Sequence, residues 1–333
     1  MTPSSTTSPP DIAPVYPRNV PPDRVREMVM ELLGIEALPR SVDCVFDEQV
    51  RGEDGTVCTR FEYRNLLGEA VPAMLCVPEG SQDALLPGVV CLPGTSASAA
   101  ELMEKDFGCD PQRKNRLVGW SRELARRGFA TVAITLCGCV GRRSSAEEWL
   151  RRVLFLAPYG RSLTGVMVDE ALRAARILAG DNAVDERRVG VAGFSLGGQM
   201  AWWAAALDPS LRATASLCGS LGSLEAVLSD GEAQRRHGPH FYVPHLLRHF
   251  DHGKIINACV APRPLMVLAP TEDEDMPKSG VDELARQVAP AYENAGARSN
   301  LSVLQPEGRH AFTQDYFETV SAWLQDKLGL REA

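Results

Sequence analysis

The sequence predicts an α/β protein with a mainly parallel, doubly wound sheet of about eight strands and helices on both faces. Two observations support this fold class. Short apolar runs alternate with longer stretches of helical periodicity from Gly88 to the end of the chain. The runs are apolar at consecutive positions, as in strands that helices cover on both faces.

The alternation consists of six predicted strands and five predicted helices. The strands are expected at residues 88–92, 131–136, 189–193, 213–218, 264–269 and 301–305. The helices are expected at residues 115–127, 163–178, 196–207, 280–295 and 311–328. In the last helix Phe317, Val320, Leu324 and Leu328 fall on one stripe, which indicates one buried face.

The chain before this alternation has a different pattern. Residues 23–33 have helical spacing. Residues 57–64 and 70–77 resemble two strands around a short turn, which predicts an antiparallel hairpin at a sheet edge. Residues 1–22 are rich in proline, serine and threonine, and we expect a flexible tail there.

Residues 23–333 are expected to form one domain, because α/β folds of this size often form a single unit. Residues 219–260 interrupt the alternation. This segment has no clear strand and is rich in histidine, arginine and aromatic residues. We expect it to be a mostly helical excursion that walls a substrate pocket.

The net charge of −8 argues against nucleic acid or an anionic membrane as the main partner, since both require basic patches. The sequence has no signal-like start and no long apolar run, which predicts a cytoplasmic protein. A homodimer is a candidate oligomeric state. Cys76, Cys91, Cys137 and Cys218 lie in or beside apolar runs and are expected to be buried, reduced thiols.

The candidate nucleophile is Ser195, at the centre of the run Gly193-Phe194-Ser195-Leu196-Gly197. This run matches G-x-S-x-G, and it lies between a predicted strand and a predicted helix. Such a turn holds the serine in a strained conformation and lifts its hydroxyl above the carboxyl edge of the sheet. The alternative is an ordinary strand–turn–helix joint with a serine cap.

The candidate base is His310, which follows the last predicted strand. The other five histidines crowd into residues 237–252. In an α/β-hydrolase the chain order is serine, then acid, then histidine, and the base has this place in the topology. The alternative is a surface or capping histidine.

The candidate acid is Asp273, in the loop after the strand at 264–269. This loop has four carboxylates, and Asp275 is the reserve candidate. One carboxylate is needed to hold the histidine ring in its productive tautomer. The two oxyanion donors are expected to be the backbone N–H groups of Leu196 and Thr95. A simple glycine turn at Gly94 is the alternative for Thr95.

These residues resemble the α/β-hydrolase superfamily, and within it the dienelactone-hydrolase and acetyl-xylan-esterase-like serine esterases. The resemblance extends from Val71 to the C-terminus. It rests on the following motifs: GFSLGG at 193–198, Gly160-Arg161-Ser162-Leu163 with Gly165, Tyr242-Val243-Pro244, Ala261-Pro262-Arg263-Pro264-Leu265, and Glu272-Asp273 with Pro277. In such enzymes the aspartate four residues before that proline is the usual acid, which supports Asp273.

Two loops depart from the family pattern. Many relatives have His-Gly where this chain has Pro93-Gly94, and many have an acidic residue where this chain reads Leu136-Cys137-Gly138-Cys139. Both loops are expected to border the pocket, so the departures concern the substrate and not the three candidate catalytic residues. The resemblance therefore implies hydrolysis more strongly than it implies any one substrate.

We therefore predict a serine hydrolase that cleaves a carboxylic ester or lactone, a small-molecule acyl substrate, through an acyl-enzyme and without metal or organic cofactor. An acyltransferase or cyclase, a thioesterase or a peptidase could use the same three residues. Two alternatives from other classes are a non-catalytic ligand receptor and a metal-binding module. For the latter, His245 and His249 have the i, i+4 spacing of helical metal ligands, and His252 follows.

Overall fold

The computed structural model describes residues 20–80, 85–113, 116–143 and 145–330. Most of the predicted tail at 1–22 therefore lies outside the described residues. In the main sheet the strands are β1 (Cys44–Arg51), β2 (Thr56–Arg64), β3 (Ala70–Pro78), β4 (Leu86–Leu92), β7 (Ala130–Ile134), β8 (Val184–Phe194), β9 (Thr214–Leu217), β10 (Leu265–Leu268) and β11 (Leu301–Leu304). Two short strands, β5 (Gly108–Asp110) and β6 (Arg116–Val118), pair separately.

The longer helices are α1 (Pro22–Leu33), α3 (Trp120–Arg126), α4 (Ala146–Leu156), α5 (Leu163–Ala179), α6 (Leu196–Leu207), α11 (Lys278–Asn294) and α12 (Gln314–Leu328). The short helices are α2 (Ala99–Leu102), α7 (Leu224–Ser229), α8 (Gly231–Arg236), α9 (Leu246–His249), α10 (His252–Ile255), η2 (Pro111–Arg113), η3 (Ala157–Tyr159), η4 (Pro239–Phe241), η5 (Ile256–Val260) and η6 (Arg298–Asn300).

The nine strands form one sheet in the order β1-β2-β3-β7-β4-β8-β9-β10-β11. β1, β2, β3 and β7 pair antiparallel, and the strands from β7 through β11 pair parallel. The predicted mainly parallel sheet and the antiparallel pairing of residues 57–64 with 70–77 are confirmed. The hairpin was expected at a sheet edge, but β1 pairs outside it and forms that edge. β1 was not predicted; its side chains are mostly exposed and three of them, Asp47, Glu48 and Arg51, are charged.

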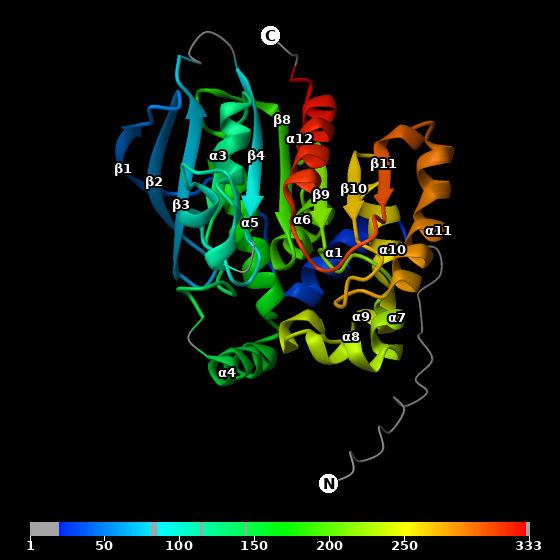
Figure 1. Ribbon diagram of the computed structural model, residues 1–333. Helices are drawn as coiled ribbons and strands as arrows, with labels where there is room; N and C mark the ends of the chain where they lie inside the picture. Colours follow the sequence, from blue (N-terminus) through cyan, green and yellow to red (C-terminus); the bar gives the residue numbers. More distant parts are fainter. Residues whose placement is uncertain (1–19, 81–84, 114–115, 144, 331–333) are drawn as a thin grey trace.

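Helices cover both faces of the sheet, as predicted (Figure 1). Alternate residues of β4 show the two layers. Val90 and Leu92 belong to the hydrophobic core beneath α1, α5 and α6. Val89 and Cys91 belong to the core beneath α3 and α12. A strand that is buried on both sides is apolar at consecutive positions, which explains the run GVVCL.

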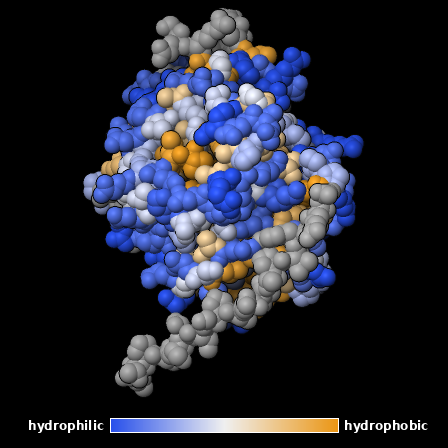
Figure 2. Space-filling view, turned by 90° about the vertical axis from the view of Figure 1, so that its right-hand side faces the viewer, coloured by the Kyte–Doolittle hydropathy of each residue, from blue (hydrophilic) through white to orange (hydrophobic). Residues whose placement is uncertain are grey.

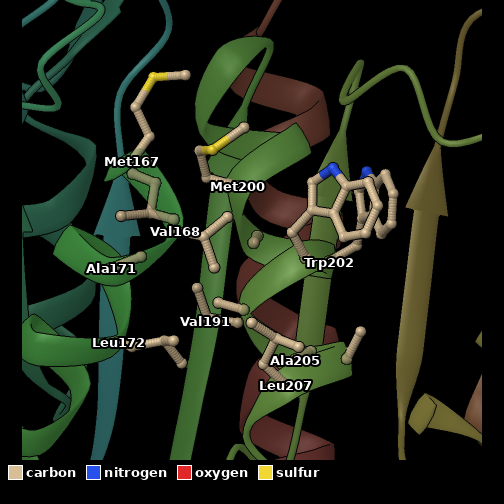
Figure 3. Close-up of a cluster of buried hydrophobic side chains, with 14 of the residues drawn as sticks. Met167, Val168, Ala171, Leu172, Val191, Met200, Trp202, Ala205 and Leu207 are labelled. Atoms are coloured by element: carbon tan, nitrogen blue, oxygen red, sulfur yellow. The ribbon is translucent and has the colours of Figure 1, made fainter. Parts of the chain in front are cut away.

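The helix after β8 is entirely buried. Every residue of α6 is buried, including Trp202 and Trp203, whose rings stack with 4.2 Å between their centroids. Figure 3 shows Met200 of this helix beside Met167 and Val168 of α5. The Nε1–H of Trp202 donates to the carbonyl of Gly219 over 3.3 Å, so this helix is tied to the loop after β9.

The excursion at 219–260 consists of short helices, α7 to α10 with η4 and η5, and has no strand among its residues. In Figure 1 the arrowheads of β4, β10 and β11 point toward the end of the sheet where α4, α7, α8 and α9 lie. The excursion therefore lies at the carboxyl edge of the parallel strands, where α/β proteins bind their ligands.

Two expectations about local structure are wrong. Residues 116–118 form strand β6, so the helix that was expected from residue 115 begins only at Trp120. Cys76 is not a free thiol, because it lies opposite Cys58 on the neighbouring strand and forms a disulfide with it. Cys91, Cys137 and Cys218 are free and buried, as expected.

The face of the molecule in Figure 2 is mostly hydrophilic, with small separate hydrophobic areas. Within the described ranges no helix has the length and apolar character needed to cross a bilayer.

Candidate active site

Ser195 occupies a sharp turn between β8 and α6. Its backbone has φ 55° and ψ −119°, a combination that L-residues rarely adopt and that costs about 1–3 kcal/mol. Two glycines make the turn possible. A Cβ on Gly193 would lie 2.3 Å from the carbonyl carbon of Gly197, and a Cβ on Gly197 would lie 2.1 Å from the carbonyl oxygen of Leu92. The G-x-S-x-G pattern is thus explained by close backbone packing.

His310 follows β11 and points its ring at Ser195. The distance between His310 Nε2 and Ser195 Oγ is 2.9 Å, which is a hydrogen bond. The side chain of His310 is 17% exposed. Its ring packs on Phe194, with 5.2 Å between the centroids. The hydroxyl and the base predicted from the sequence therefore lie in direct contact.

Asp273 lies on the other side of the imidazole. Its Oδ1 is 2.9 Å from His310 Nδ1, and its side chain is only 1% exposed. Asp275, the reserve candidate, lies 3.6 Å from the same nitrogen through Oδ2. The backbone N–H of Asp275 donates to Asp273 Oδ1 over 2.9 Å. The structure therefore places Asp273 in the hydrogen-bonded position and Asp275 beside it.

The loops that carry the acid and the base run side by side. The N–H of Thr271 donates to the carbonyl of Pro306 over 2.9 Å, and the N–H of Glu272 donates to the carbonyl of Gly308 over 2.8 Å. An ion pair between Glu274 and Arg309 joins the same two loops. This pairing continues the β10–β11 register into the loops and fixes the contact between Asp273 and His310.

The surroundings of His310 raise its pKa. Burial alone lowers the pKa, because it disfavours the imidazolium. The hydrogen bond to Asp273 and its negative charge, with smaller contributions from Asp275 and Glu274, outweigh burial and give a net increase. The imidazolium that forms when a histidine takes up a proton is therefore stabilised at this position.

Residues of the excursion contact the acid loop directly. The Nε–H of Arg236 donates to Asp275 Oδ1 over 2.8 Å, and His237 Nε2 lies 2.7 Å from the carbonyl oxygen of Asp275. The ring of His237 stacks on the ring of Phe241, with 3.7 Å between the centroids. The excursion therefore lies beside the site, where the sequence analysis expected a pocket wall.

The two predicted oxyanion donors are on segments that meet at Ser195. Leu196 is the first residue of α6, and the first N–H groups of a helix have no intrahelical acceptor. The loop of Thr95 lies next to the nucleophile, because a Cβ on Gly94 would be 3.5 Å from Ser195 Cβ. The carbonyl of Thr95 accepts the N–H of Val140 over 3.1 Å, so the loop at 136–142 supports the oxyanion loop.

A buried carboxylate organises that supporting loop. Glu170 of α5 accepts the N–H of Cys137 over 2.9 Å and the amide of Asn65 over 2.8 Å, and it pairs with Arg142 at 2.9 Å. Burial raises the pKa of Glu170 to about 7, although Arg142 and the hydrogen bonds lower it. Glu170 was not predicted as a site residue, because a glutamate within a helical pattern is normally expected at the surface.

Other candidate residues have roles away from the three side chains. Arg263 donates to the carbonyls of Leu211, Ala205 and Cys259, each over 2.6 Å. His245 has a left-handed backbone and precedes the single turn of α9, so His245 and His249 do not share a helix face. In the described part of the chain, neither histidine belongs to a convergent group of metal ligands.

Comparisons with known proteins agree with this geometry. The sequence profile described as "Dienelactone hydrolase family" matches residues 107–324. The chain belongs to the dienelactone hydrolase family. This match covers β5 through most of α12, and therefore contains all three side chains of the hydrogen-bonded chain.

A curated relative of this dienelactone hydrolase family member is "Putative hydrolase YtaP" of Bacillus subtilis (strain 168). It is 32% identical over 191 residues, which are 57% of this chain and 62% of the relative. The chain thus matches less than two thirds of that relative's length.

Two solved structures share the fold of the whole chain. The glucuronoyl esterase from Solibacter usitatus has a TM-score of 0.70 at 16% identity, covering 96% of this chain and 99% of its own. Acetyl xylan esterase 1 from Thermoanaerobacterium sp. JW/SL YS485 has a TM-score of 0.66 at 16% identity, covering 96% of this chain and of its own. The predicted α/β-hydrolase fold is confirmed.

Proposed function

We propose that this protein is a serine hydrolase that cleaves a carboxylic ester or lactone through an acyl-enzyme on Ser195. The observation that carries the proposal is the continuous chain of two 2.9 Å hydrogen bonds from Ser195 Oγ through the imidazole of His310 to Asp273. A serine hydroxyl is a weak nucleophile until a base takes its proton, and this chain supplies the base and its orienting carboxylate.

The proposed reaction has two steps. His310 Nε2 takes the hydroxyl proton while Ser195 Oγ attacks the acyl carbon, and the negative charge of Asp273 stabilises the imidazolium. The imidazolium then gives its proton to the leaving oxygen as the C–O bond breaks. In the second step His310 takes a proton from water, the hydroxide oxygen attacks the acyl-enzyme, and Ser195 recovers its proton.

The tetrahedral oxyanion of each step is proposed to lie between the backbone N–H groups of Leu196 and Thr95. The positive end of the α6 dipole adds to this stabilisation, since it points from the helix start at Leu196 toward the developing charge. No metal or organic cofactor takes part in this scheme.

The names of the similar structures and of the family favour esters over amides and thioesters as substrates. The two solved structures with the same fold are named glucuronoyl esterase and acetyl xylan esterase, and the family of the chain is named for a dienelactone hydrolase. We propose a short acyl ester or lactone of a small molecule as the substrate, in a cytoplasmic protein.

The test is covalent labelling combined with turnover. The protein is treated with a fluorophosphonate, digested and mapped by mass spectrometry, and hydrolysis of p-nitrophenyl acetate is measured in parallel. We expect one adduct, on Ser195, and loss of turnover by about 10⁴-fold or more in Ser195→Ala. A panel of acetyl, lactone, thioester and amide substrates then ranks the leaving groups.

The matched control is Ser220→Ala. Ser220 is a buried serine that also has a positive φ, of 49°, but it lies outside the hydrogen-bonded chain. We expect this variant to keep both the label on Ser195 and the turnover. An adduct on Ser220, or an unlabelled protein without turnover of any ester in the panel, would contradict the proposal.

A further inference from the structure

The carboxylate of Asp273 has one oxygen that its neighbours leave without a partner. Oδ1 accepts from both His310 Nδ1 and the N–H of Asp275. Oδ2 is buried and has no hydrogen-bond partner in the part of the chain that the structure describes. A buried, ionised oxygen without a hydrogen-bond donor is strongly disfavoured. A donor close to Oδ2 would therefore stabilise the ionised carboxylate.

Cys218 supplies a thiol at this place. It follows β9, is 2% exposed, and belongs to neither the acid loop nor the base loop. Its Sγ, a carboxylate oxygen of Asp273 and a ring nitrogen of His310 all lie within 4.8 Å of one another. The thiol can also donate to the carbonyl of Ala311, at 3.6 Å. A carboxylate is the stronger acceptor of the two, because it is charged.

The backbone at Cys218 is held in an unusual conformation that points the side chain to this spot. Its φ is 46°, which non-glycine residues seldom adopt, and its N–H donates to the carbonyl of Leu268 over 2.8 Å. That carbonyl belongs to β10, the strand that leads into the loop of Asp273. The same strand pairing therefore sets the positions of both the thiol and the carboxylate.

We propose that Cys218 is a positioning residue, whose thiol donates a hydrogen bond to Asp273 Oδ2 and thereby holds the carboxylate in line with His310. Cys218 acts through Asp273 and touches neither substrate nor Ser195. This inference rests on the proposed function, because the alignment matters only if His310 acts as a base. Burial and the negative charge of Asp273 raise the pKa of the Cys218 thiol, so it keeps its proton and remains a donor.

We expect loss of the Cys218 thiol to shift the pH dependence of kcat/KM. Without the thiol, the carboxylate loses a donor that stabilises its charge, so the protonated state of His310 becomes more favourable and the acidic limb of kcat/KM moves to higher pH. Other charged or titratable groups around the acid and the base stay in place in every variant; they are Asp275, Glu274, Arg309, Arg236, His237 and Tyr316.

The test compares three substitutions at this position in the full-length protein, with p-nitrophenyl acetate as substrate. Cys218→Ser keeps a donor, and we expect its kcat and its acidic limb to match the wild type within about threefold. Cys218→Ala removes the donor, and we expect kcat to fall about tenfold with unchanged KM and with the acidic limb at higher pH. Cys218→Gly also lacks the donor but relieves the positive φ, so it tests the same effect if the alanine variant does not fold.

The matched controls are Cys259→Ala and Cys259→Ser. Cys259 is another buried free cysteine, in η5, and its Sγ is near the carbonyl of Pro22. We expect both controls to keep the wild-type pH profile. Identical acidic limbs for the serine, alanine and glycine variants of Cys218 would overturn the inference. Failure of wild-type protein to react with the fluorophosphonate or to hydrolyse esters would instead overturn the proposed function.

Discussion

The backbone N–H of Asp275 donates to Asp273 Oδ1 over 2.9 Å, so one carboxylate residue fixes the orientation of the other. The side chain of Asp275 is itself held by Arg236 of the excursion and stays 3.6 Å from His310 Nδ1. Asp273 and Asp275 both lie beside the imidazole of His310. Only Asp273 hydrogen-bonds to the ring, whereas the side chain of Asp275 is bound by Arg236.

This difference predicts the effects of two substitutions. Asp273→Asn places an amide where the imidazole requires a carboxylate, and we expect kcat to fall about 10³- to 10⁴-fold. Asp275→Asn keeps the backbone donor to Asp273, and we expect a loss of about tenfold or less. Steady-state hydrolysis of p-nitrophenyl acetate measures both. A larger loss in the Asp275 variant than in the Asp273 variant would reverse the assignment of the acid.

The net increase in the pKa of His310 predicts the pH dependence of activity. His310 must be neutral to act as a base, and its pKa is raised above the ordinary value of 6.5. We therefore expect half-maximal kcat/KM on the acidic limb at a pH above 6.5. Removing the charge of Asp273 takes away the principal raising influence, so the residual activity of Asp273→Asn should have its limb at lower pH. Asp282→Asn, an exposed carboxylate on α11, controls for net charge.

Glu170 predicts a stability effect. It is fully buried and pairs with Arg142, whose side chain is 12% exposed. Glu170→Ala leaves Arg142 without this partner and removes the acceptor for Cys137, and we expect the free energy of unfolding to fall by about 3 kcal/mol or more. Urea denaturation measures it. The control is Glu147→Ala, which breaks an ion pair that is 78% exposed on both sides and should change stability by less than about 0.5 kcal/mol.

The pKa of Glu170, raised to about 7, also sets the sign of a pH effect on stability. A buried acid whose folded pKa exceeds its ordinary value of 4.5 binds more protons in the folded state than in the unfolded state between these two values. The contribution of Glu170 to stability therefore decreases as the pH rises from 4.5 toward 7. Unfolding of wild type and Glu170→Gln across this range should show a smaller decrease in the variant.

Gly197 predicts a packing effect. A methyl group there would overlap the carbonyl oxygen of Leu92 at 2.1 Å, and backbone cannot move aside as a side chain can. We expect Gly197→Ala to lose at least about 3 kcal/mol of stability or to fail to fold, as thermal unfolding would reveal. Gly231→Ala, where the nearest atom is 3.7 Å away on a flexible arginine, should unfold like the wild type.

The elements that the sequence predicted well are those that are buried on both sides. The run GVVCL is apolar throughout because Val89 and Val90 belong to different cores, and such a run is visible in a single sequence. β1 has no comparable pattern, because its residues are mostly exposed and its position follows from pairing with β2. The helix expected from residue 115 begins late for a similar reason, since residues 116–118 pair with 108–110.

Some residues of the candidate site could also be predicted from the sequence, and others could not. Ser195, Asp273 and His310 occupy fixed places in the strand–helix order, so chain order alone brings them to one edge of the sheet. Cys218 and Glu170 act through contacts between segments that are distant in sequence. Cys218 is expected only as a small buried apolar residue, and no spacing in the sequence pairs it with Asp273.

The hydrogen bonds from Thr271 and Glu272 to the loop of His310 have a consequence for the way this site is held together. The imidazole of His310 and the carboxylate of Asp273 are therefore carried by two loops that hydrogen-bond to each other. Ser195 is held by a different segment, because its N–H donates to the carbonyl of Leu217 in β9 over 2.8 Å. The 2.9 Å hydrogen bond between Ser195 Oγ and His310 Nε2 therefore joins two parts of the site that different backbone segments hold in place.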